Sequence, residues 1–115
     1  MMMEADERQL LLTSAWIFAR HGQRARARVL CEALVEDDPR DGVSAAALAE
    51  LLLEEQAAES ALGVLLAADY PPELDRAEAL LETRALAQLG RREDAERRWR
   101  RFIASQKGKN RSWVG

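Results

Sequence analysis

The sequence has few of the residues that disulfide-bonded, metal-binding or strand-rich proteins need. It contains one cysteine, Cys31, so no disulfide can form within the chain and a reducing cytoplasm is the expected location. One cysteine and one histidine, His21, cannot supply the four ligands of a structural zinc site. Only 5% of the residues are aromatic and three are proline, which argues against a strand-rich fold.

Segments typical of membrane insertion, secretion or catalysis are also lacking. No apolar run approaches the roughly 20 residues that cross a bilayer, and the opening MMMEADE does not resemble a secretory signal. The sequence has no glycine-rich phosphate loop, no GxSxG motif and no HExxH motif. We therefore expect no membrane span, no enzyme activity and no cofactor. The thiol of Cys31 is expected in the core, where it would be inert.

The residues that are abundant favour helices. Hydrophobic residues make up 48% and charged residues 32% of the 115 residues, and alanine, leucine, glutamate and arginine dominate. These residue types are good helix formers, and the balance is typical of a folded protein of one domain. We therefore expect a single all-α domain over residues 1–115.

Charge is distributed unevenly along the chain. Residues 1–75 carry 6 basic and 15 acidic residues, a balance of −9, whereas residues 76–115 carry 11 and 5, a balance of +6. Three interpretations of the basic end remain open: a solvated helix face, a surface for an acidic partner or for self-association, and a nucleic-acid surface. The pI near 5.3 argues against nucleic acid. The acidic runs at 36–38 and 54–55 are expected to be solvated. The basic residues concerned are Arg91, Arg92, Arg97, Arg98, Arg100, Arg101, Lys107, Lys109 and Arg111.

The most informative pattern is a repeat with a period of 34 residues. Three segments align at this spacing, and each second helix carries an alanine where the two helices of a pair would cross closely. A period of 34 is typical of tetratricopeptide repeats, which stack to form a common core and a concave binding face. The aligned positions are Gly22, Gln56 and Gly90 at the turns, Ala27, Ala61 and Ala95 at the crossings, and Cys31, Leu65 and Trp99 after them.

The period predicts three tetratricopeptide-like helix-turn-helix repeats forming a short right-handed superhelix. The repeats are expected at about 8–41, 42–75 and 76–106, with a basic, frayed tail at 107–115. The middle turn lacks the glycine of the other two. The six helices are predicted at about 6–21, 23–37, 41–54, 57–67, 73–89 and 92–105.

Several residues of the first repeat carry a resemblance to a known family. They are Leu10, Leu11, Leu12, Trp16, Gly22, Arg24, Ala25, Leu30, Ala33, Leu34 and Pro39. With the chain length and the positions of the repeats, these residues resemble the small Y-type (YscY/SctY) chaperones of type III secretion systems, over about residues 6–106.

The resemblance implies a cytoplasmic chaperone that uses no nucleotide. Such a chaperone would bind a small secreted substrate of the X type in an apolar groove and deliver it to the export apparatus. Two alternatives remain open: a general tetratricopeptide scaffold or regulator, and a homodimeric chaperone of translocator proteins. Members of the latter class usually have a longer helical extension before the first repeat, where about seven residues stand here.

The repeat register also predicts which residues line the concave face. Trp16 is the best candidate for an anchor, because aromatic anchors tend to dominate interface energies; packing of Trp16 in the core against the second helix is the alternative. The predicted groove residues are Gln9, Leu12, Trp16 and Ala19 in the first helix, Val43, Ala46, Glu50 and Leu53 in the third, and Ala77, Leu80, Arg84 and Ala87 in the fifth.

Overall fold

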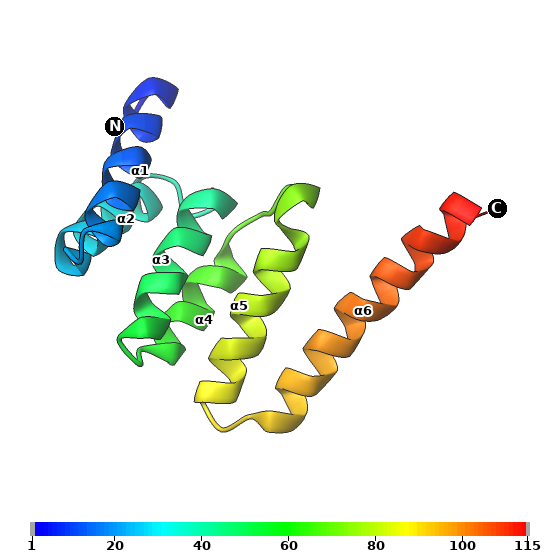
Figure 1. Ribbon diagram of the computed structural model, residues 1–115. Helices are drawn as coiled ribbons and strands as arrows, with labels where there is room; N and C mark the ends of the chain where they lie inside the picture. Colours follow the sequence, from blue (N-terminus) through cyan, green and yellow to red (C-terminus); the bar gives the residue numbers. More distant parts are fainter. Residues whose placement is uncertain (1, 115) are drawn as a thin grey trace.

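The chain folds into helical hairpins that follow one another along an elongated array (Figure 1). A computed structural model describes the backbone of residues 2–114 and the side chains of residues 2–109. Within the described residues there are six α-helices, one short 3-10 helix and no β-strand. The elements are α1 (Ala5–Arg20), α2 (Arg24–Asp37), α3 (Gly42–Glu54), α4 (Ala58–Ala67), η1 (Pro72–Leu74), α5 (Asp75–Gln88) and α6 (Arg92–Val114).

The same turn closes each of the three hairpins. Gly22 and Gly90 both have φ +77°, and Gln56 has φ +62° at the corresponding place in the middle turn. After each turn, a backbone amide donates to a carbonyl five residues earlier: Gln23 to Phe18 (2.8 Å), Ala57 to Leu52 (2.8 Å) and Arg91 to Leu86 (2.9 Å). This is the pattern of a helix that ends at a left-handed residue. The prediction of an all-α fold with three helix-turn-helix repeats is therefore confirmed.

A substitution at Gln56 should stabilise the protein, because the glutamine adopts the left-handed region of φ in the middle turn. A side chain at positive φ costs about 1–2 kcal/mol, of which the extra entropy of an unfolded glycine offsets about half. We expect Gln56→Gly to raise the free energy of unfolding by about 0.5–1 kcal/mol. Urea unfolding followed by circular dichroism measures this change. Gly22→Gln should move stability in the opposite direction, and a loss of stability in Gln56→Gly would contradict the argument.

The predicted alanine crossings are confirmed. Ala27 and Ala61 are 0% exposed and Ala95 is 5% exposed, so no larger side chain fits between the paired helices. Cys31 is also buried, and burial raises the pKa of its thiol to about 11. The prediction of an inert core cysteine therefore agrees with its environment.

The loops before α3 and before η1 touch at one side of the array. The amide of Asp69 donates to the carbonyl of Arg40 (2.9 Å), and Gly42 packs directly against Asp69 and Tyr70. A Cβ atom on residue 42 would overlap the carbonyl oxygen of Asp69 and the ring of Tyr70. The absence of a side chain at Gly42 thus lets the second hairpin pack this closely on the following loop.

One predicted boundary is wrong. The first five helices begin and end within two residues of their expected bounds, but α6 continues to Val114 where a frayed tail was predicted from residue 107. No proline follows Ser105 to stop the helix. In addition, the ammonium of Lys109 lies 3.2 Å from the carboxylate of Asp75, which ties the extension to the first turn of α5. Residue 115 lies outside the described part of the chain.

None of the helices in the described part of the chain combines the length and the apolar character that a membrane crossing would require.

Candidate functional site

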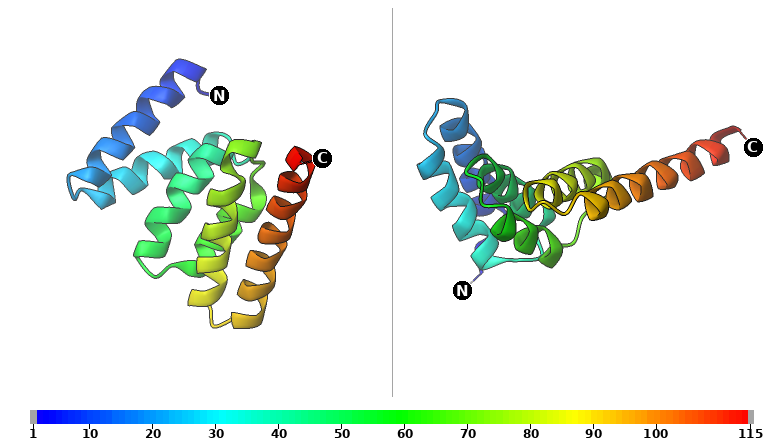
Figure 2. Two further views of the ribbon diagram at one scale, coloured as in Figure 1. Left: turned by 45° about the vertical axis from the view of Figure 1, so that its right-hand side comes forward. Right: turned by 90° about the horizontal axis from the view of Figure 1, so that it is seen from below.

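Side chains of α1 and α3 line an apolar groove of about 510 Å³. Figure 2 shows the course of these two helices. Leu12, Trp16 and Ala19 of α1 form one wall, and Val43 and Ala47 of α3 form the other. Trp16 is 59% exposed, so the alternative of a core tryptophan is wrong. A large exposed aromatic side chain at the mouth of an apolar groove is the arrangement expected of an anchor point for a partner.

The α1 wall matches the predicted positions, but the α3 wall does not match them fully. Gln9, Leu12, Trp16 and Ala19 all line the groove, and so do Val43 and Glu50. Leu53 is only 1% exposed and belongs to the core, and Ala46 does not line the groove. The residues of α3 that line the groove are 43, 47, 50, 51 and 54, so the predicted register is wrong in two places.

The predicted residues of α5 lie outside this groove. Leu80, Arg84 and Ala87 are exposed on α5, and Ala77 is half-buried, but none of the four lines the hollow between α1 and α3. The groove therefore spans the first two hairpins. Sequence reasoning missed several of its lining residues, and among them Arg24 has no repeat signal at all. The missed residues are Thr13, Ala15, Arg24, Cys31, Ala47, Leu51 and Glu54.

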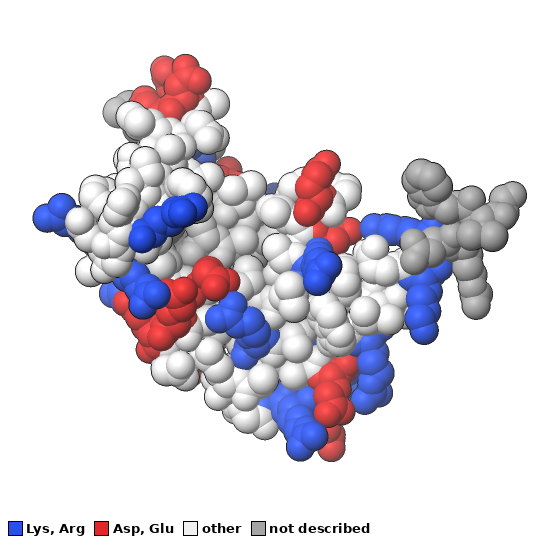
Figure 3. Space-filling model, in the orientation of Figure 1, with Lys and Arg blue, Asp and Glu red and all other residues white. Residues whose placement is uncertain are grey.

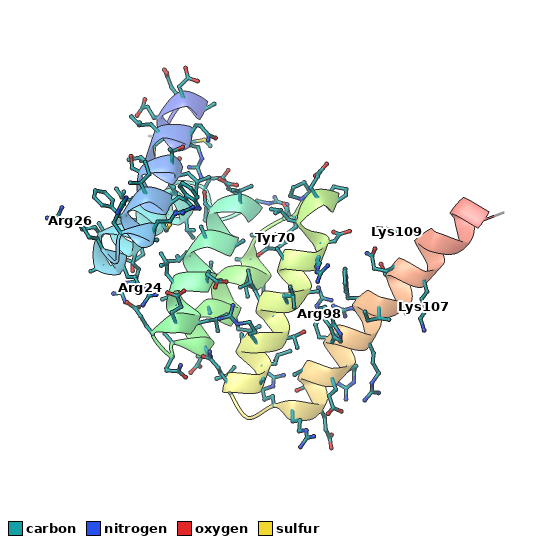
Figure 4. The ribbon with its side chains drawn as sticks, in the orientation of Figure 1. Arg24, Arg26, Tyr70, Arg98, Lys107 and Lys109 are labelled. Carbon is teal, nitrogen blue, oxygen red and sulfur yellow. The ribbon has the colours of Figure 1, made fainter. Side chains whose placement is uncertain are left out.

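Two ion pairs lie along the α3 side of the groove. Glu50 accepts a hydrogen bond from the guanidinium of Arg84 (3.0 Å), and Glu54 pairs with Arg24 (2.9 Å). Figure 3 shows red and blue side chains side by side beneath the hollow, and Figure 4 labels Arg24 at this place. All four side chains are well exposed, so each pair contributes little stability. Their charges are instead available to orient a polar partner segment along the α3 wall.

Arg20 adds a positive charge on the α1 side of the groove. Its guanidinium carbon lies 4.7 Å from the centroid of the Trp16 ring. This cation–π contact covers part of the ring and restricts its rotamers. Trp16 is therefore exposed but held in place.

Arg8 positions the α1 wall. Its guanidinium donates to Asp37 of α2 (2.7 Å), to Asp41 just before α3 (2.7 Å) and to the carbonyl of Leu34 (3.1 Å). The side chain of Asp37 is 8% exposed, so the prediction of a solvated acidic run at 36–38 is wrong for this residue. The partners lie 26–33 residues from Arg8, which is why local sequence reasoning did not find the contact.

The Arg8 contact predicts acid sensitivity. Burial alone would raise the pKa of Asp41, but hydrogen bonds from Arg8 and Ser44 outweigh burial and hold the pKa below its ordinary value. A carboxyl group with a lowered folded pKa stabilises the fold above its unfolded pKa, near 3.9, and loses that contribution as pH falls through the folded value. Asp41→Asn keeps a good helix cap but removes the charge. We expect it to lose about 1–2 kcal/mol at neutral pH and to show a flatter decline in acid.

Urea unfolding of both proteins from neutral pH to below the pKa of Asp41 measures this dependence. Glu59→Gln, in the first turn of the exposed α4 surface, is a control that removes one charge far from Arg8. Parallel pH profiles of the original chain and Asp41→Asn would show that the Asp41 carboxylate contributes nothing to the pH dependence.

A second buried ion pair joins the last two helices. The guanidinium of Arg98 donates to Glu82 at 2.6 Å, and the two side chains are 12% and 8% exposed. The solvated-face interpretation of the basic end therefore does not hold for Arg98, which Figure 4 labels between α5 and α6. Burial, with the neighbouring Glu82 carboxylate, raises the pKa of Glu78.

Other basic residues of α6, and Arg91 just before it, are paired on the surface. Arg91 and Arg97 contact Asp94, and Arg92 and Arg100 contact Glu96. The two carboxylates balance half of these four charges, and the arginines are held in exposed local pairs, which agrees with the solvated-face interpretation of this segment. The side chain of Arg111 lies outside the described residues.

The described residues contain no group of three or more histidine, cysteine, aspartate or glutamate side chains placed to hold a metal ion. No family model matches the chain, and no curated protein matches it. The chemistry of the groove is therefore the basis for a functional assignment: an exposed, fixed tryptophan, apolar walls on two helices, and paired charges along one edge.

Proposed function

We propose that the chain is a chaperone of a type III secretion system, of the small Y type. It holds an amphipathic helical segment of a small secreted X-type substrate in the groove between α1 and α3, and it brings that substrate to the export apparatus. It works in the cytoplasm, uses no nucleotide or other cofactor, and binds neither nucleic acid nor membrane. The repeats are tetratricopeptide repeats in this proposal.

The groove with Trp16 at its mouth carries the proposal. A segment without a core of its own exposes an apolar helix face, and an apolar groove of about 510 Å³ offers a surface that replaces the missing core. The ion pairs Arg84–Glu50 and Arg24–Glu54 lie along one edge, where the polar face of such a helix meets solvent. The period of 34 residues and the left-handed residue at each of the three turns support the tetratricopeptide assignment.

Coexpression tests the proposal. The chain is produced alone and together with each small protein encoded beside its gene, and the products are analysed by size-exclusion chromatography with light scattering. A dedicated chaperone should form a discrete complex with one small neighbour, and that neighbour should become soluble only in its presence. If no neighbour is captured and the chain is well behaved alone, a general tetratricopeptide scaffold becomes the better assignment.

A further inference from the structure

The outer edge of the first hairpin is formed by repeat positions that are buried between hairpins in the later repeats. In the second repeat, the residues 34 positions after Leu10, Ser14 and Ile17 are 1%, 4% and 7% exposed. In those hairpins the first helix packs on the second helix of the hairpin before it. These positions are therefore the ones through which one repeat docks on another. In α3 the counterparts of Leu10, Ser14 and Ile17 are Ser44, Leu48 and Leu51. In α5 the counterparts of Ser14 and Ile17 are Glu82 and Ala85.

In the first hairpin this docking edge is exposed, yet it remains apolar. Leu10 is 67% exposed and Ile17 is 46% exposed, and Val29 of α2 is 62% exposed. Beside them, Phe18, Val29 and Leu30 line a shallow hollow of about 370 Å³. At its rim, the guanidinium carbon of Arg26 lies 5.8 Å from the centroid of the Phe18 ring. Large apolar side chains that lie together on an exposed surface mark an interaction site. An apolar edge at this place is therefore expected to be covered.

The opposite end of the array is different. On α6, the outward side chains Arg97 and Arg100 are 72% and 76% exposed. Ile103, at 37%, is the one large apolar side chain of the described part of α6 that is more than about a third exposed. This end has the polar covering that the first hairpin lacks. A head-to-tail contact would take these arginines and their carboxylate partners out of water and place them against leucine and isoleucine, which is costly.

The first hairpin edge, by contrast, is complementary to itself. A stripe of α1 next to Leu10 and Ile17 recurs at spacings of four and three, the spacing of a seam between two packed helices. It consists of Glu7, Leu11, Ser14, Phe18 and His21, of which Leu11, Ser14 and Phe18 are half-buried in the single chain. Glu7 and His21 stand equally far from Ser14, about 10 Å along the helix on either side. Two antiparallel α1 helices crossing at Ser14 would thus place Glu7 of each copy beside His21 of the other. The small Ser14 permits a close approach at the crossing.

We propose that two copies of this chain pair edge to edge, first hairpin against first hairpin. The α1 helices lie antiparallel and cross at Ser14. Leu10 of each copy then lies opposite Phe18 of the other and covers the hollow there, and Ile17 lies opposite Leu11. The contact is isologous and closes with two copies. The groove residue Trp16 lies on another face of α1, so both binding surfaces are open at the same time.

Sedimentation velocity of the full chain over a wide range of concentrations tests the pairing. We expect a species of twice the 12.9 kDa chain mass that does not grow further. Leu10→Glu and Ile17→Glu should each raise the dissociation constant at least about tenfold with helicity unchanged. Leu66→Glu, which changes another exposed leucine on α4, should leave the dimer intact. A monomer at all concentrations, open-ended growth, or a dimer that survives both edge changes would overturn the proposal.

The orientation has its own test. His21→Glu places two carboxylates together at each end of the antiparallel seam and should weaken the dimer, and adding Glu7→Lys should restore it. In the Ser14→Cys variant, mild oxidation should form a disulfide between the two copies. In the Gln9→Cys variant, which changes the groove face, no such disulfide should form. Failure of Ser14→Cys to cross-link in a chain that is dimeric would place the contact elsewhere. These results are independent of substrate capture, so the proposed function can fail while the pairing holds.

Discussion

Ala61→Arg is expected to abolish cooperative folding. Ala61 is 0% exposed at the crossing of α3 and α4, in the hairpin that packs on both of the others. An arginine there overfills the contact, at about 1–3 kcal/mol, and buries an unpaired charge, at several kcal/mol more. A domain of this size has only about 5–15 kcal/mol of stability in total. Thermal melting followed by circular dichroism should show no sigmoidal transition.

Gly63→Arg is the matched control for this prediction. It lies two residues further along α4, is exposed, and has no atom within 4 Å of the place where a Cβ would stand. The same side chain is therefore tolerated there, and replacing a helical glycine should raise stability slightly. If Ala61→Arg melts cooperatively near the temperature of the original chain, the close crossing at Ala61 does not exist.

Trp16→Glu is expected to abolish capture of the partner while the fold is kept. The side chain is 59% exposed and makes no essential core contact, so helicity and melting temperature should change little. Loss of a central aromatic anchor typically costs 2 kcal/mol or more, about a thirtyfold loss of affinity, and the introduced carboxylate adds a desolvation cost. Copurification with the coexpressed partner, followed by titration calorimetry, measures the effect.

The neighbouring residue supplies the control. Ile17→Glu changes the outer edge of the same helix, so it should break the dimer and leave partner capture intact, whereas Trp16→Glu should do the reverse. Undiminished capture by Trp16→Glu would remove the groove from the proposed function. A collapse of helicity in that variant would show instead that the ring supports the fold.

Much of the fold follows from local sequence signals, because each hairpin repeats the same local requirements. Gly22 and Gly90 predict turns through their freedom at positive φ, and Ala27, Ala61 and Ala95 predict close crossings through their small size. The middle turn shows the limit of this reasoning: Gln56 takes φ +62° because the hydrogen bond from Ala57 to Leu52 requires it, although its side chain disfavours the conformation.

The groove was less predictable than the fold. Because α3 is apolar on nearly every side, its sequence pattern fits several rotations of the helix about its axis equally well. Leu53 and Glu54 are adjacent in sequence, yet the first is buried and the second lines the groove. The packing of α3 against α2, α4 and α5 decides between them. The Arg8 contacts and the Arg98–Glu82 pair join helices whose relative positions no local pattern specifies.

The order of the helices has a consequence for how the chain acquires its structure. Nearly all the close packing joins helices that are neighbours in sequence, with α3 against α5 as the main exception. The loops to be closed are therefore short, and their entropic cost is small. Each hairpin can form as soon as it leaves the ribosome and then serve as the template for the next. The chain should reach its structure within milliseconds or faster, before synthesis adds many further residues.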